Sequence, residues 1–362
     1  MDPRIVEHAR IIVDHSIAVK PGDEVLIKAP SEAEDLAVAL NELLGDRGAR
    51  PIYIGPSSRA QRAFMRAMDP DDYDGPPATY MALAENVDAS IAIRAASNTN
   101  ETSDIPPEKT TAYSALMKPF QEKMADKRWV ATQHPAPGNA QDAEMSTAAY
   151  ADFVYEAVNK DWEDQRAFQE NLVALLEEGR EIRIRSGDAT DITMSIDGMV
   201  PVNDYGEKNL PGGEVFTAPN PDSVEGEVLF DKPLMAYGRE VTDVQLVFSK
   251  GEVVDYRAGK NQDVLEAVLE TDDGARRLGE LGFGMNRDID QFTHNMLFDE
   301  KMGDTVHMAL GHAIDESIGL DRTGNESAIH MDMIVDMSED SVIEIDGERI
   351  QRNGTFVFED GF

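Results

Sequence analysis

The chain has 362 residues and contains 33 Lys and Arg against 70 Asp and Glu, a formal net charge of −37. This length suggests two domains with a sizeable core, and 41% hydrophobic residues argue against disorder. The charge argues against a nucleic-acid partner and against binding to an anionic membrane surface, because both need an exposed basic face. Without cysteine, disulfides, iron–sulfur clusters and a cysteine nucleophile are excluded.

The hydropathy and composition predict a cytoplasmic, salt-adapted protein. The opening Met-Asp-Pro-Arg-Ile-Val-Glu-His has no apolar region of the kind found in signal peptides. No apolar run approaches the 18 residues of a membrane span. Only 12 residues are lysine while acids are abundant, and molar salt screens such self-repulsion by shortening the Debye length to about 3 Å. An ordinary acidic protein with a solvated carboxylate surface is the alternative.

The first half of the chain alternates helix and strand signals. Apolar residues recur at helical spacing over residues 3–18. Apolar runs then predict strands over residues 24–28, 51–54, 89–93 and 129–132. This alternation is typical of a parallel sheet with helices on its faces. No glycine-rich phosphate-binding motif follows these strands, so the sequence does not support a nucleotide site.

The pattern changes in the second half. Residues 143–178 are expected to be helical and to connect the domains. Short strands follow, separated by turn dipeptides of the kind found in hairpins, namely Asp197-Gly198, Asp346-Gly347 and Asn353-Gly354. We therefore predict an α/β N-terminal domain with a parallel sheet over residues 1–165, and an α+β C-terminal domain with mostly antiparallel strands over residues 166–362.

Histidines cluster in the predicted C-terminal domain. Four of the seven lie within residues 294–330, where random placement would put fewer than one. One of them belongs to a predicted strand over residues 328–335, in which His330 and Asp332 share a face because side chains alternate along a strand. An imidazole and a carboxylate at this spacing could hold one metal ion or two adjacent ones. A hydrogen-bonded pair facing solvent, among otherwise ordinary histidines, is the alternative.

Three glutamates lie beside predicted apolar strands of the same domain. Glu214 follows a Pro-Gly-Gly turn, Glu280 enters a strand after a glycine, and Glu300 precedes a glycine turn and then His307. A carboxylate that enters an apolar strand needs a partner, because an unpaired buried charge is costly. That partner could be a metal ion or an arginine, and hairpins with solvated acidic tips remain the alternative.

Together these side chains predict metal-assisted hydrolysis. Carboxylates with few histidines suit a pair of divalent ions about 3.5–4 Å apart. Such a pair would lower the pKa of a bridging water and polarise the scissile carbonyl, while a further carboxylate could move the proton.

In several ordered segments the chain resembles the aminopeptidase T and aminopeptidase S family of metallo-aminopeptidases. These segments are residues 19–25, which read Val-Lys-Pro-Gly-Asp-Glu-Val, and residues 209–219, 278–283, 298–311 and 327–336. The resemblance spans nearly the whole chain. It implies an α/β N-terminal domain, a C-terminal domain with a two-metal site, a homodimer with an enclosed cavity, and peptide substrates with a free N-terminus.

The resemblance also implies roles for individual residues. The metal ligands would be Glu214, Glu280, Glu300, His307, His330 and Asp332. The two divalent ions could be Zn, Co or Mn, all of which suit carboxylate and imidazole donors. The resemblance leaves open which ligand bridges the ions, and either Glu280 or Glu300 is expected to act as the general base.

One position departs from the family pattern. After the His-x-Ala-x-Gly stretch the family often has a Tyr-Pro pair whose tyrosine is thought to help catalysis, whereas this chain has Ile314-Asp315. Loss of an oxyanion donor typically costs about 10²–10³ in rate. His312, two residues earlier, is a candidate donor in its place.

We therefore predict a metal-dependent aminopeptidase. Two alternatives remain open at this point. One is a catalytically weak metal-binding or peptide-binding protein of the same fold, which Ile314 favours. The other is a two-metal hydrolase of a non-peptide amide, which would not require a free amino group on its substrate.

Overall fold

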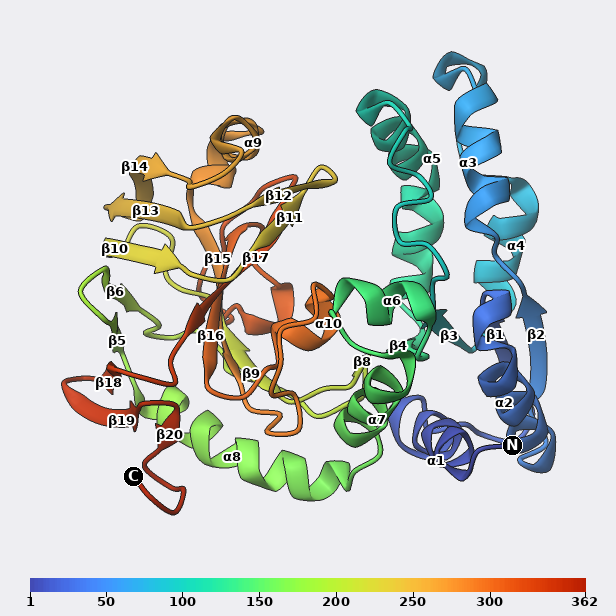
Figure 1. Ribbon diagram of the computed structural model, residues 1–362, viewed down its shortest axis with the longest axis horizontal. Coiled ribbons are helices and arrows are strands. Elements are labelled where there is room, and N and C mark those ends of the chain that lie inside the picture. The colour runs from blue at the N-terminus through green and yellow to red at the C-terminus, as the bar shows by residue number, and fades with distance from the viewer. The chain divides into compact units, whose positions relative to one another are not determined.

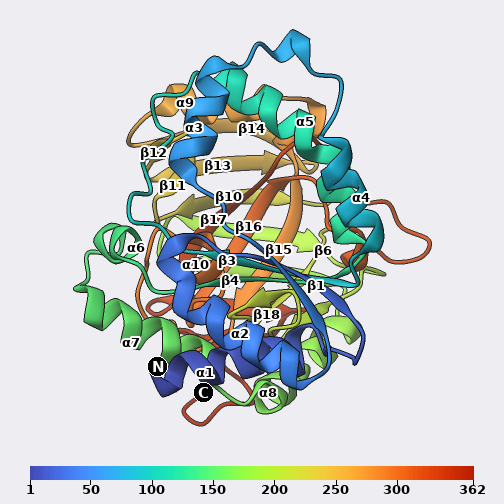
Figure 2. The ribbon, with the colours of Figure 1, turned by 90° about the vertical axis from the view of Figure 1, so that its right-hand side faces the viewer.

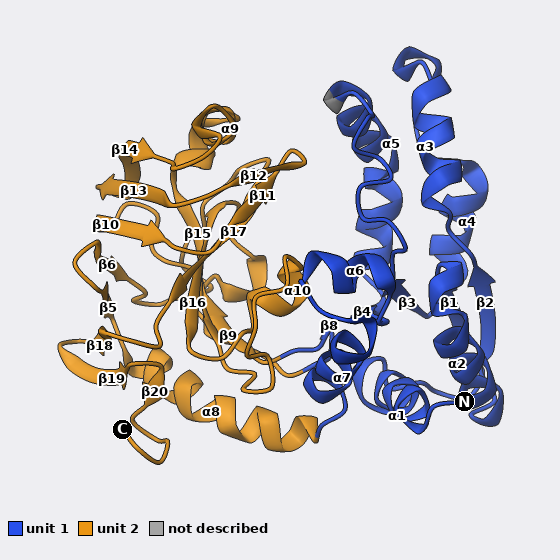
Figure 3. Cartoon of the chain, in the orientation of Figure 1, with its two compact units in different colours: residues 1–160, 206–212 blue, residues 161–205, 213–362 orange. Residues whose placement is uncertain are grey.

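The computed structural model describes residues 1–362, with the side chain of residue 107 excepted. The chain divides into two compact units, coloured separately in Figure 3. Unit 1 comprises residues 1–160 and 206–212, and unit 2 comprises residues 161–205 and 213–362. Residues 206–212 therefore belong to unit 1, although the chain on both sides of them belongs to unit 2.

Unit 1 is built on a five-stranded sheet in the order β2-β1-β3-β4-β8, and its strand pairs are parallel. This confirms the predicted parallel sheet. Helices α3, α4 and α5 lie on one side of these strands and α1, α2 and α7 on the other (Figures 1 and 2). The strands are β1 (Glu24–Lys28), β2 (Arg50–Ile54), β3 (Ala89–Arg94), β4 (Arg128–Gln133) and β8 (Asn209–Leu210). The helices and helical turns are α1 (Pro3–Ile11), η1 (Ile12–Ser16), η2 (Ser31–Ala33), α2 (Glu34–Asp46), α3 (Ser58–Ala67), η3 (Pro70–Asp72), α4 (Ala78–Asn86), α5 (Pro107–Ala125), α6 (Pro137–Asp142) and α7 (Thr147–Val158).

The prediction of one continuous helical segment over residues 143–178 is wrong. The structure has two helices there, α7 and then α8 (Trp162–Glu178). Asp161 begins the second helix, since its side chain accepts hydrogen bonds from the backbone N–H groups of Glu163 and Asp164. Such an N-cap stabilises a helix start by about 1 kcal/mol. This local capping signal interrupts a stretch whose apolar spacing alone suggests one helix.

Unit 2 holds two large antiparallel sheets and a small hairpin. Their orders are β14-β13-β10-β6-β5-β18-β19-β20, β17-β16-β15-β9-β7 and β11-β12. The named strand pairs are antiparallel, which confirms the predicted second domain type. The strands are β5 (Glu181–Ser186), β6 (Thr190–Ser195), β7 (Val202–Asp204), β9 (Glu214–Thr217), β10 (Glu225–Phe230), β11 (Leu234–Ala236), β12 (Arg239–Val241), β13 (Val244–Ser249), β14 (Glu252–Arg257), β15 (Leu278–Gly284), β16 (Thr305–Gly311), β17 (His330–Asp336), β18 (Ser341–Ile345), β19 (Glu348–Arg352) and β20 (Thr355–Phe356). The helices besides α8 are α9 (Gln262–Leu269), η4 (Asp273–Arg276), α10 (Met296–Asp299) and η5 (Asp315–Ser317).

One apolar core joins the two large sheets of unit 2. Leu281, Phe283 and Val306 from the five-stranded sheet belong to the same buried cluster as Phe230 and Phe248 from the eight-stranded sheet. Because side chains alternate along a strand, these residues fix which face of β15 and β16 turns toward the core. The polar residues between them are therefore directed to the other face, which carries the candidate site. None of the described helices has both the length and the apolar character needed to cross a membrane.

Candidate metal centre

Four strands of the five-stranded sheet carry five of the six predicted metal ligands. Glu214 begins β9, and Glu280 lies on β15. In the strand register, Ala309 of β16 lies opposite both Glu280 and Asp332, so these three residues form a row across β15, β16 and β17. His330 lies two residues before Asp332 on the same strand, and residues at this spacing share a face. The sheet therefore brings together side chains that are up to 118 residues apart in sequence, from Glu214 to Asp332.

His307 occupies the neighbouring row and lies opposite Gly282. A Cβ atom added to Gly282 would lie 2.0 Å from Nε2 of the His307 ring. The missing side chain thus provides the space for the imidazole over β15. The small residue at this position is part of the site, because it lets His307 reach the acids on both of its sides.

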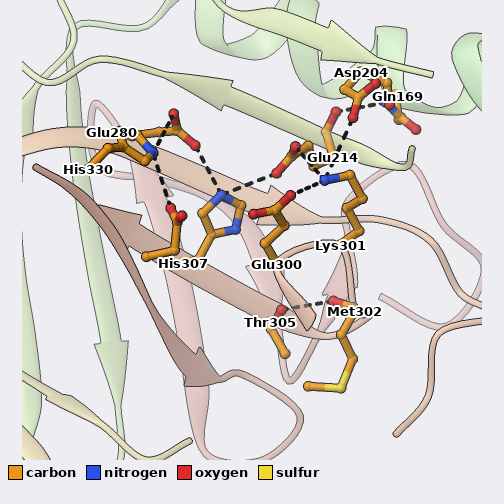
Figure 4. A network of polar contacts seen from close by, with 11 residues as sticks. Gln169, Asp204, Glu214, Glu280, Glu300, Lys301, Met302, Thr305, His307 and His330 are labelled. Carbon is orange, nitrogen blue, oxygen red and sulfur yellow. Dashed lines mark hydrogen bonds and ion pairs between the residues drawn. The ribbon is translucent and has the colours of Figure 1, made fainter. Parts of the chain in front are cut away.

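Two carboxylates converge on one nitrogen of His307. The Nε2 atom lies 3.2 Å from Oε2 of Glu214 and 3.2 Å from Oε1 of Glu280 (Figure 4). All three side chains are buried. A single ring nitrogen carries at most one hydrogen, so it cannot donate to both oxygens at once. A cation bound between the three atoms would satisfy them together.

A second group of ligands shares Glu280. Its Oε2 atom lies 3.8 Å from Nε2 of His330, which is 3.4 Å from Oδ1 of Asp332. The other ring nitrogen of His330, Nδ1, donates to the backbone carbonyl of His312 at 2.8 Å. This bond orients the ring and leaves Nε2 as the nitrogen that faces the acids, an arrangement common among metal-binding histidines.

The two groups fit divalent ions. Each offers one nitrogen and two carboxylate oxygens whose ligand atoms lie within 4.8 Å of one another. Donor atoms about 2.1 Å from a tetrahedral zinc ion would lie roughly 3.4 Å apart, close to the distances between these atoms. Oε2 of Glu214, Oε2 of Glu280 and Oδ1 of Asp332 are buried and have no hydrogen-bond partner among the described residues. Unpaired buried acceptors are expensive, and a bound cation would remove that cost.

A buried lysine adjoins the first group. Lys301 is completely shielded from solvent, and its Nζ lies 3.0 Å from Oε1 of Glu214. It also pairs with Glu300 and lies 3.8 Å from Oδ2 of Asp204 (Figure 4). Glu300 therefore joins the network through its ion pair with Lys301.

A side chain of helix α8 holds the backbone around Glu214 in place. The Gln169 side-chain amide is buried and donates from Nε2 to the carbonyls of Glu214 at 2.9 Å and of Asp204 at 3.0 Å.

The sequence did not predict a role at the site for Gln169, Asp204 or Lys301. The available signal for Lys301 was its place directly after Glu300, in a chain with only 12 lysines.

Burial and mutual repulsion shift the pKa values of these groups. Burial raises the pKa of Glu280, to which the charges of Asp332 and Glu214 add. Burial also raises the pKa of Glu300 to about 8, against the opposing effect of Lys301. For His330, burial lowers the pKa, but Asp332 and Glu280 outweigh it and raise the pKa to about 10. The acids thus attract positive charge strongly, which either protons or divalent ions can supply.

The remaining candidates, His312 and Ile314, lie just beyond the end of β16. His312 contributes its backbone carbonyl to His330, and the contacts among the described residues do not link its imidazole to the ligand groups. The carbonyl of Ile314 accepts hydrogen bonds from the backbone N–H and the hydroxyl of Ser317. The structure therefore brings five of the six predicted metal ligands into direct contact and connects Glu300 to them through a lysine.

Comparison with known proteins finds one matching family and several similar relatives. The model of a family described as "Thermophilic metalloprotease (M29)" matches residues 1–362. Aminopeptidase 2 of Geobacillus stearothermophilus is 28% identical, over 98% of this chain and 97% of the relative. Aminopeptidase T of Thermus thermophilus is 27% identical, over 96% and 97%.

Two solved structures share the fold. Wild-type AmpT from Thermus thermophilus has a TM-score of 0.87 at 26% sequence identity, with 98% of this chain and 99% of that chain covered. A 2,5-dihydroxypyridine dioxygenase from Pseudomonas putida KT2440 has a TM-score of 0.58 at 14% identity, with 99% and 97% covered. The second likeness concerns the fold alone, and the two names differ in chemistry. Function must therefore be argued from the side chains of the site.

Proposed function

The chain belongs to the family of thermophilic metalloproteases (M29), and on that premise we propose that it is a metal-dependent aminopeptidase that releases N-terminal residues from peptides. It is a hydrolase of peptide bonds. The observation that carries the proposal is the convergence of two three-residue ligand groups that share Glu280. Paired ions held in this way are a common basis for peptide and phosphoester hydrolysis.

Two ions are favoured over one by geometry and by charge. Glu214, Glu280 and His307 would hold one ion, and Glu280, His330 and Asp332 would hold the other, so that Glu280 belongs to both ligand groups. The five carboxylates of the network and the ammonium of Lys301 leave four negative charges, which two divalent ions would neutralise. When bound, the ions supply Lewis acidity, which lowers the pKa of a water molecule and polarises the peptide carbonyl.

Glu300 is the better placed of the two general-base candidates. Both oxygens of Glu280 face histidines, since Oε1 lies near His307 and Oε2 near His330. The Glu300 side chain is anchored to Lys301 through Oε1, which leaves Oε2 to accept a proton from water and to pass it to the leaving amine. A carboxylate whose pKa is raised toward neutrality suits this role.

The test of this function is a pair of chromogenic substrates that differ only at the amino group. We expect leucine p-nitroanilide to be hydrolysed in molar potassium chloride and N-acetyl-leucine p-nitroanilide to be hydrolysed at least about 10³-fold more slowly. An aminopeptidase recognises the free amine, and a site built to bind a polar group rejects analogues that lack it by large factors.

Equal hydrolysis of both substrates would contradict the proposal and favour a two-metal hydrolase of other amides. No hydrolysis of either, by folded protein with bound metal, would favour a catalytically weak binding protein. Protein treated with chelator provides the control for activity that does not depend on metal.

The wider setting is also part of the proposal. The low lysine content and the net charge of −37 support a salt-adapted protein, because molar salt screens repulsion between surface carboxylates. The same net charge argues against nucleic-acid and anionic-membrane partners. We also propose a cytoplasmic location. The family resemblance supports a homodimer, with Zn, Co or Mn as the metal ions.

A further inference from the structure

Lys301 stands apart from the other lysines described, because it is completely buried beside the candidate metal centre. It follows Glu300 at the end of helix α10, and its side chain has no exposed surface. Lysine is rarely buried in full unless it is paired. Here the partners are three carboxylates, those of Glu214, Glu300 and Asp204.

The contact with Glu214 divides the two oxygens of that carboxylate between different partners. Oε1 lies 3.0 Å from Nζ of Lys301, whereas Oε2 lies 3.2 Å from Nε2 of His307. Figure 4 shows Lys301 and His307 on opposite sides of Glu214. The ammonium thus holds one oxygen away from the ligand group and leaves the other directed into it. Gln169 fixes the backbone of the same residue, so both ends of Glu214 are held.

We infer that Lys301 is a positioning residue that makes Glu214 a one-oxygen ligand for the ion that Glu214, Glu280 and His307 would hold. This inference rests on the proposed function and deepens it. Partners that orient a ligand are typically worth 10- to 100-fold in metal affinity. The group of Glu280, His330 and Asp332 does not include Glu214, so the affinity of that group for its ion should depend little on Lys301.

A simple role as counter-charge makes the opposite prediction. An ammonium near a metal site repels the cation, so a lysine that only neutralised excess acid would weaken metal binding. Its removal would then tighten binding, or would let the released carboxylates take up an additional ion. The sign of the change in affinity therefore separates positioning from charge compensation.

The experiment compares metal binding by the wild-type protein with that of K301M, whose side chain has similar length but no charge. Chelator-treated protein is titrated with Mn²⁺ in molar potassium chloride, and the two binding steps are measured by calorimetry. We expect one step to weaken about 10- to 100-fold and the other to stay within about threefold. E214Q should lose the same step, whereas D332N should lose the other.

Two further variants control for excess negative charge at the site and for the loss of a paired lysine in general. Because K301M leaves three acids without their cation, the double variant K301M/D204N removes one acid together with the lysine. It should remain folded by circular dichroism and still show the one weakened step. K232M is the matched control, because Lys232 pairs with Asp336 at 2.9 Å elsewhere in unit 2, and both of its binding steps should be unchanged.

The possible results distinguish a failure of the proposed role of Lys301 from a failure of the proposed metal centre. Two unchanged steps, two equally weakened steps, or tighter binding in K301M and its double variant would overturn the role of Lys301 while leaving the metal centre intact. If the wild-type protein binds fewer than two ions, the proposed centre itself fails, and the inference about Lys301 fails with it.

Discussion

Replacement of Glu280 by Gln is expected to lower kcat/KM for leucine p-nitroanilide by at least about 10⁴-fold, in the range found when a central catalytic group is removed. Glu280 is the acid that both ligand groups share. Its two oxygens face His307 and His330 separately, so the change removes a ligand from both proposed ions. An amide in its place keeps the volume but cannot supply a negative charge to either ion.

The same variant should also lose both ions at metal concentrations that saturate the wild-type protein. Inductively coupled plasma analysis after dialysis gives this count directly. E344Q is the matched control, since Glu344 is a partly buried glutamate of the same unit that pairs with Arg185 at 3.1 Å. Its activity and metal content should match the wild type. If E280Q keeps two ions and more than a tenth of the activity, Glu280 is not the bridging ligand.

Replacement of Gly282 by Ala is expected to cost at least about 10²-fold in kcat/KM, although it adds only one methyl group. The new Cβ would lie 2.0 Å from Nε2 and 2.1 Å from Cε1 of His307. The imidazole would have to move, and displacement of a catalytic group by about 1 Å can cost that much in rate. Since His307 belongs to only one ligand group, one ion should be lost and the other kept.

G45A is the control for this substitution. Gly45 lies in helix α2 with no atom within 4 Å of an added Cβ, and alanine favours helices over glycine by about 1 kcal/mol. We expect its activity to be unchanged. Normal activity and two bound ions in G282A would show that the His307 ring does not need the space above Gly282.

The sequence predicts the fold class well because its signals are local. Strands β1 and β3 of unit 1 are largely apolar and buried, as expected where helices cover both faces of a parallel sheet. The two-residue strand β8 has no such signal. In unit 2, β5, β6, β13 and β18 alternate between buried and more exposed residues, and turn dipeptides separate several of its strands. The site strands β9, β15 and β16 are instead buried along their whole length. The break between α7 and α8 was missed because Asp161, a single capping residue, outweighs the apolar spacing around it.

The site is only partly predictable from the sequence. His330 and Asp332 lie two residues apart on one strand, so their shared face follows from the sequence pattern. The sharing of Glu280 depends instead on the register of β15 with β16 and β17, which no local pattern fixes. The burial of Lys301 was not predicted, because a lysine that follows two acidic residues is normally exposed to solvent.

The paired-ion centre is tested by measuring the metal dependence of activity together with the metal content of the protein. The protein is stripped with chelator in molar potassium chloride, and the hydrolysis of leucine p-nitroanilide is followed as Zn²⁺, Co²⁺ or Mn²⁺ is added back. We expect no activity in the stripped protein, and activity with at least one of these metals that reaches its maximum at two bound ions per chain. Full activity without metal, or a maximum at one ion, would contradict a paired-ion centre in which both ligand groups include Glu280.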